Sequence, residues 1–179
     1  MRWFWIDRFT EFVSGKYAVA LKGVSLAEDP VDEYSPGWSY LPASLVIEGM
    51  AQTGGILVNQ LSDFKNRVVL AKVGSCKFHD QAYPSDTLMF RAELTNLQPN
   101  GAFVSGHVHC GGKPFCEMEL MFAFLTDERF ENVQLFEPAN FCRMLRLLRM
   151  FEVAKNEDGS PVAVPKYMLD AEVAMLQGI

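Results

Sequence analysis

The chain has 179 residues, 49% of them apolar, which fits one domain or one domain with an appendage. Its formal net charge of -6 argues against a nucleic-acid-binding protein, which would carry a basic surface. The longest apolar run, Leu41 to Leu61, holds Glu48 and Gln52, so it does not predict a membrane span. With no CxxC pair and no secretory signal, we expect a cytoplasmic protein with reduced thiols and no metal.

The predicted elements follow one another in a simple order. A partly alternating run over 16–25 predicts a strand, and a proline-rich stretch over 27–42 predicts a loop. From Pro42 to about Leu61 the sequence is apolar nearly all round, which predicts a helix enclosed by protein. Four β-rich runs separated by turn sequences then predict an antiparallel meander, and they cover 67–78, 87–98, 102–110 and 114–126.

This order of elements predicts an α+β fold in which an antiparallel sheet wraps around a long central helix. We expect that domain to occupy residues 1–130. Residues 131–179 differ, because apolar residues recur at helical spacing over 136–155 and a last helix is predicted after a break at NEDGSP. We therefore expect a C-terminal helical extension that packs on the sheet or on a partner chain.

The sequence HVHC, which contains His107, His109 and Cys110, resembles a metal site at first glance. Alternation along a strand places both histidines on one face, and this is more typical of a polar outer face than of a metal site. Cys110 and Cys116 flank a GGKPF turn, so a contact between them across a hairpin is open.

The segment over 36–57, PGWSYLPASLVIEGMAQTGGIL, carries a family resemblance. It resembles the active-site segment of the hot-dog 3-hydroxyacyl-[acyl-carrier-protein] dehydratases of fatty-acid synthesis, roughly H-F-P-G-x-P-x-M-P-G-x-L-x-x-E-x-M-A-Q. The opening FWIDRFTEFVSGKYAVALKGVS, the segment KFHDQAYPSDTLMFRAEL and the strand CEMELMFAF are similar to other parts of that family, so the resemblance extends from residue 1 to about 126. The positions that match the active-site pattern are Pro36, Gly37, Pro42, Leu45, Glu48, Met50, Ala51 and Gln52.

The resemblance implies a hot-dog fold and the dehydration of a 3-hydroxyacyl thioester. Glu48 matches the family's helix carboxylate and is expected to be the main acid and base. The first amides of the helix, at Ala43 and Ser44, match the groups that hold the thioester oxygen, and a helix start offers free N–H groups for that purpose. Gly37 and Gln52 are likewise expected to bind substrate.

Two departures from the family pattern bear on the chemistry. Tyr34 stands where the family has its catalytic histidine, and Ala43 stands where it has a glycine. A phenol, with a reference pKa of ~10, is a poor base at neutral pH. We therefore expect Tyr34 to act as a donor while Glu48 takes the substrate proton.

Three functions stay open at this level. The first is a dehydratase-like protein acting on acyl thioesters in fatty-acid or related lipid synthesis. The second is a hot-dog thioesterase that uses Glu48, and the third is a non-catalytic acyl-binding subunit that pairs with an active dehydratase. The resemblance implies an acyl carrier protein or coenzyme A thioester as partner. Together with the charge and the polar residues in the longest apolar run, it leads us to expect no cofactor, nucleic acid or membrane. It also implies a homodimer or a trimer of dimers, with a heterodimer as the alternative.

Overall fold

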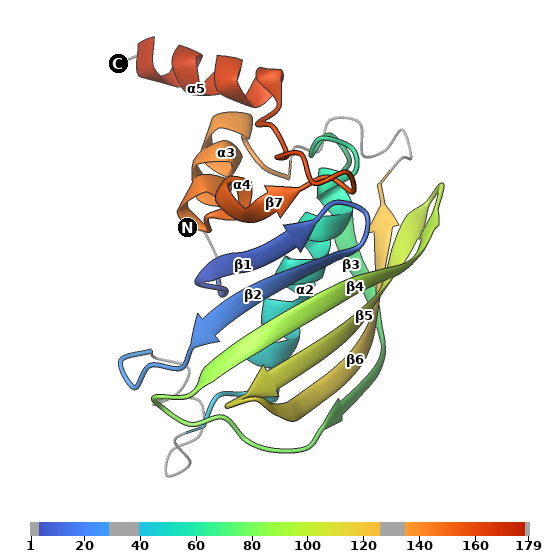
Figure 1. Ribbon diagram of the computed structural model, residues 1–179, viewed down its shortest axis with the longest axis vertical. Helices are drawn as coiled ribbons and strands as arrows, with labels where there is room; N and C mark the ends of the chain where they lie inside the picture. The colour runs from blue at the N-terminus through green and yellow to red at the C-terminus, as the bar shows by residue number, and fades with distance from the viewer. Residues whose placement is uncertain (1–3, 29–39, 126–134, 178–179) are drawn as a thin grey trace.

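The computed structural model describes residues 4–28, 40–125 and 135–177, and a curved sheet that wraps around one long helix dominates it (Figure 1). The strand order is β3-β6-β5-β4-β2-β1-β7. Neighbouring strands are antiparallel, except that β7 runs parallel to β1. The strands are β1 (Arg8–Val13), β2 (Tyr17–Gly23), β3 (Val68–Phe78), β4 (Thr87–Gln98), β5 (Gly101–Cys110), β6 (Lys113–Phe124) and β7 (Ala154–Lys155).

β3 takes a different place in the sheet from the one expected. β4, β5 and β6 form a meander, but β3 pairs with β6 and is the outermost strand. The expectation of a four-stranded meander was wrong here, because the connection over 79–86 is longer than the roughly 2–5 residues of a hairpin loop and lets the chain cross the sheet. β1, which the pattern did not predict, pairs with β2.

The helix α2 (Ala43–Gln60) lies in the concave face of the sheet, as predicted (Figure 1). Small residues bring it close to the strands. A Cβ atom on Gly49 would lie 2.6 Å from the ring of Phe90, and one on Gly54 would lie 3.2 Å from Phe122. The helix therefore lies so close to the sheet at position 49 that only glycine fits there.

The C-terminal part forms α3 (Pro138–Leu147), α4 (Met150–Val153) and α5 (Lys166–Gln177), stacked beyond β1 (Figure 1). The helical pattern over 136–155 is thus two helices followed by β7, because Arg149 adopts a left-handed conformation with φ of 58° that ends α3. Leu145, Met150 and Met168 are almost fully buried in the same core as the sheet. The division into 1–130 and 131–179 stays a prediction, and residue 130 itself lies outside the described residues.

The histidines of β5 lie on the outer face of the sheet, where they alternate with the buried Gly106 and Val108. Nowhere in the described residues do three His, Cys, Asp or Glu side chains come together as a metal site would need. Cys116 contacts Cys76, with 3.6 Å between the sulfur atoms, and not Cys110, because the hairpin register sets Cys116 opposite Val108.

No helix in the described part of the chain is long and apolar enough to cross a membrane.

Candidate active site

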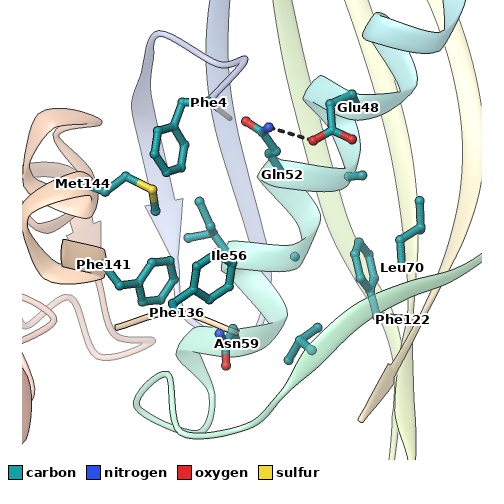
Figure 2. Close-up of a pocket in the computed structure, with 13 residues that line it drawn as sticks. Phe4, Glu48, Gln52, Ile56, Asn59, Leu70, Phe122, Phe136, Phe141 and Met144 are labelled. Carbon is teal, nitrogen blue, oxygen red and sulfur yellow. Dashed lines mark hydrogen bonds between the residues drawn. The ribbon is translucent and has the colours of Figure 1, made fainter. Parts of the chain in front are cut away.

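Glu48 lies in the second turn of α2 and faces a pocket of about 240 Å³ between α2, β3, β6 and α3 (Figure 2). Most of the wall is apolar and rich in aromatic rings. The lining residues are Phe4, Glu48, Ala51, Gln52, Gly55, Ile56, Asn59, Val68, Leu70, Phe122, Phe136, Phe141 and Met144. An apolar pocket with a few convergent polar groups is the usual form of a small-molecule site.

The polar side chains of the pocket form one stripe along α2. Glu48, Gln52 and Asn59 stand at positions i, i+4 and i+11, which share a face because 11 residues make about three turns. Ile56 lies on the same face, between Gln52 and Asn59 (Figure 2). The helix therefore presents a carboxylate at one end of the pocket, an apolar middle, and an amide at the other end.

Gln52 holds the carboxylate of Glu48. Its Nε2 donates to Oε1 of Glu48 over 2.7 Å, and its Oε1 accepts from the backbone N–H of Trp5 over 2.8 Å and, more weakly, from that of Ile6 over 3.4 Å. Backbone N–H groups can only donate, so they fix the orientation of this amide and direct its donor at Glu48. Gln52, expected from the sequence to contact substrate, thus both lines the pocket and orients Glu48.

The start of α2 supplies donors near Glu48. Pro42 is the N-cap residue and offers no side-chain cap, while its carbonyl accepts from Leu45 N and Val46 N at 3.0 and 3.4 Å. The N–H groups of Ala43 and Ser44 find no partner within the described residues, as the geometry of a helix start requires. Ser44 precedes Glu48 by one turn on the same face.

The alanine that replaces the family glycine fits the helix start without strain. Ala43 is the first residue of α2 and is absent from the non-glycine residues with positive φ, which in the described chain are Asp63, Phe64, Ser85 and Arg149. The replacement therefore leaves the amide at position 43 in a helical orientation.

The structure brings Glu48, Gln52, Ala43 and Ser44 together on the first turns of α2, whereas Tyr34 and Gly37 lie outside the described residues. Sequence reasoning missed the wall opposite the helix. Phe4, Phe136, Phe141 and Met144 come from the two ends of the chain. The sequence shows Phe141 and Met144 at helical spacing, but it does not show on which surface these two side chains pack.

A curved antiparallel sheet wrapped around one long central helix defines the hot-dog class. The chain belongs to the FabA-like domain family, which matches residues 4–119. It is 33% identical over 119 residues to the 3-hydroxyacyl-[acyl-carrier-protein] dehydratase FabZ of Staphylococcus epidermidis, a match that covers 66% of this chain and 82% of the relative. The protein is therefore a dehydratase-like hot-dog protein, and the expected fold class is confirmed.

Solved structures agree on the fold. The dehydratase heterocomplex ApeI:P from Xenorhabdus doucetiae aligns with a TM-score of 0.59 and 14% identity over 70% of this chain and 85% of that one. A hypothetical thioesterase with coenzyme A from Streptococcus pneumoniae aligns with a TM-score of 0.54 and 12% identity over 65% and 84%. These likenesses show the hot-dog fold and do not separate the two activities.

Proposed function

We propose that this chain dehydrates 3-hydroxyacyl thioesters in fatty-acid or related lipid synthesis, with Glu48 as the group that takes the substrate proton. The observation that carries the proposal is the arrangement on α2. A carboxylate held by Gln52 faces an apolar pocket, and unpaired helix-start amides lie within about a turn of it. The family relationship to a FabZ dehydratase supports the reaction type.

The reaction needs a base, an acid and donors for the thioester oxygen. Glu48 takes the proton from C2, and the electrons of that C–H bond form the C2–C3 double bond through an enolate. The amides of Ala43 and Ser44, at the positive end of the helix, stabilise the negative charge on the thioester oxygen. The C3–O bond then breaks, and the leaving hydroxyl takes a proton from the phenol of Tyr34 and departs as water. The proton on Glu48 returns to Tyr34 and closes the cycle.

The acyl chain of the substrate would lie in the pocket along α2, because the pocket walls between Gln52 and Asn59 are mostly apolar. The thioester would lie at the helix start, where Ala43 and Ser44 are exposed. That opening suits a carrier such as acyl carrier protein or coenzyme A. A hot-dog protein from Streptococcus mutans, which aligns with a TM-score of 0.56, is bound to acetyl CoA.

The test is hydration of a short enoyl thioester and dehydration of the matching 3-hydroxyacyl thioester by the purified protein, beside Glu48→Gln and Tyr34→His. We expect turnover by the wild type and a loss of roughly 100-fold or more in Glu48→Gln, since general acid–base catalysis contributes at that scale. We expect Tyr34→His to be at least as fast as the wild type, because imidazole is the better proton-transfer group near neutral pH.

Two results would overturn the proposal. Release of free acid in place of the enoyl product, abolished in Glu48→Gln, would identify a thioesterase. An inactive wild type that gains dehydration in Tyr34→His would identify a chain that has given up the reaction and binds or pairs instead.

A further inference from the structure

The end of the pocket opposite Glu48 has a polar group that the proposed reaction does not use. Asn59 lines the pocket and is only 5% exposed, and its Oδ1 has no hydrogen-bond partner within the described residues. Buried side-chain amides are nearly always paired, because a buried acceptor without a donor costs free energy. An unpaired amide oxygen at the end of a ligand pocket therefore points to a ligand group that donates a hydrogen bond.

The wall around Asn59 comes from the C-terminal extension. Figure 2 shows Phe136 and Phe141 beside this end of α2, with Met144 on the same side. The rings of Phe136 and Phe141 are stacked, with 4.5 Å between centroids, and Phe141 also packs edge-on against Phe64 at 5.6 Å. Phe136, Phe141 and Met144 lie beyond the part that matches the FabA-like domain family, 4–119. The far end of the pocket therefore combines Asn59, from the matched domain, with a wall that comes from outside it.

We propose that Asn59 and the Phe136–Phe141 wall form a distal subsite for an acyl chain that carries a hydroxyl group at its far end. A hydroxyl group both donates and accepts, so it pairs with either atom of the Asn59 amide. A methyl end would leave Oδ1 of Asn59 unpaired. The inference rests on the proposed function in one respect, which is that the acyl chain enters the pocket beside Glu48.

The spacing along α2 sets the expected length of the chain. Eleven residues of helix span ~16 Å between Glu48 and Asn59. An extended chain advances about 1.2 Å per bond, so roughly twelve carbons reach from the thioester end to the amide. Shorter chains end among the apolar side chains of the middle of the pocket, such as Ile56 and Phe122, where a hydroxyl finds no partner.

The experiment compares the binding of two series of acyl pantetheine amides, which neither dehydrate nor hydrolyse. One series ends in a methyl group and the other in a hydroxyl group, and each runs from hexanoyl to hexadecanoyl. For the wild type we expect the hydroxyl end to bind more tightly by about tenfold near dodecanoyl, and more weakly for hexanoyl. In Asn59→Leu, which replaces the amide with an apolar group of similar size, the methyl end should bind more tightly at every length.

The wild-type comparison alone is decisive if Asn59→Leu does not fold. Equal affinities of the two dodecanoyl compounds, or a preference that Asn59→Leu keeps, would overturn the subsite. Phe136→Ala is a second variant, since Phe136 is half exposed. Opening the wall there should move the best methyl-ended chain to greater length, and an unchanged length profile would contradict the role of the extension.

The two proposals fail in different ways. If the purified protein turns over no thioester but prefers the hydroxyl-ended dodecanoyl amide, the dehydratase proposal fails and the subsite stands. If turnover depends on Glu48 while both dodecanoyl amides bind equally, the subsite fails and the dehydratase stands.

Discussion

At the scale of single residues, Gly49 sets the distance between α2 and the sheet beside the candidate base. A Cβ there would meet Cζ of Phe90 at 2.6 Å, and the ring of Phe90 is fully buried. We expect Gly49→Ala to lower the free energy of unfolding by about 1–3 kcal/mol, because the helix must move away from a packed ring. Gly55→Ala is the matched control, since its Cβ would meet Phe122 at an ordinary 3.4 Å.

Urea unfolding of the two variants measures this difference. Gly55→Ala should be neutral or more stable by up to about 1 kcal/mol, because alanine favours a helix interior. An equal loss in both variants would show that the contact with Phe90 is not the cause.

Gln52 is expected to act on catalysis through Glu48. Gln52→Leu removes the donor to the carboxylate and leaves the N–H of Trp5 without this acceptor. Turnover should fall by up to about 100-fold with KM little changed, since a misplaced catalytic group costs rate and not affinity. The measurement is steady-state kinetics of the wild type and the variant on one enoyl thioester. A change in KM alone would show that Gln52 binds substrate instead.

The candidate site was partly predictable from the residues. Glu48 stood out because a carboxylate in an apolar helix is rare and because the surrounding residues match a family pattern. The orienting bond from Gln52 depends on where the N-terminal segment passes, which no local pattern encodes. Phe136 and Asn59 are far apart in the sequence, so the pocket that both of them line exists only once the C-terminal part has packed on α2.

At the scale of elements, Tyr167 ties α5 to the end of α2. Its hydroxyl donates to the carbonyl oxygens of Asp63 and Phe64 at 3.0 and 3.1 Å. Burial raises the pKa of Tyr167, so the folded state disfavours the phenolate. The stabilisation is therefore complete below the reference pKa of ~10 and is lost as the pH rises through the higher pKa of the folded state.

We expect Tyr167→Phe to lower the free energy of unfolding by about 1 kcal/mol at neutral pH, through the lost hydrogen bonds. The difference from the wild type should shrink above pH ~10, where the wild type itself loses the contribution. Denaturant unfolding at both pH values checks this. Tyr83→Phe is the control, because the bond that its hydroxyl makes within the described residues is an exposed one to Gln81, and it should change little at either pH.

The elements that the sequence revealed are those with a long regular pattern. β2, α2 and the strands from β3 to β6 were found within a few residues of their observed ends. β1 was missed because RFTEFV follows an aromatic opening with no turn signal before it. The break at Arg149 was missed because a left-handed residue is normally marked by glycine or asparagine, and here it is an arginine.

At the scale of the whole molecule, the two edges of the sheet differ. One edge is formed by β7, which is only Ala154–Lys155. The chain then turns back, and Pro161 forms an antiparallel β-bridge with Lys155. β3 forms the other edge over 11 residues, Val68–Phe78, and most of it is exposed. Leu70 and Val73 are 39% and 36% exposed along that strand. A long apolar edge is unusual on a monomer, because its free backbone groups pair readily with another strand.

We therefore expect two copies to pair through β3, which gives a homodimer of twice the 20.1 kDa chain mass. Val73→Asp should yield monomers, because like charges brought together across a two-fold axis repel. Met89→Asp is the control, since Met89 is also 36% exposed but lies on the inner strand β4. Light scattering coupled to size-exclusion chromatography measures the masses.

Dissociation by Met89→Asp and not by Val73→Asp would place the interface on the outer face of the sheet. A monomeric wild type would exclude the homodimer and direct the search to a homologous chain whose edge strand pairs with β3.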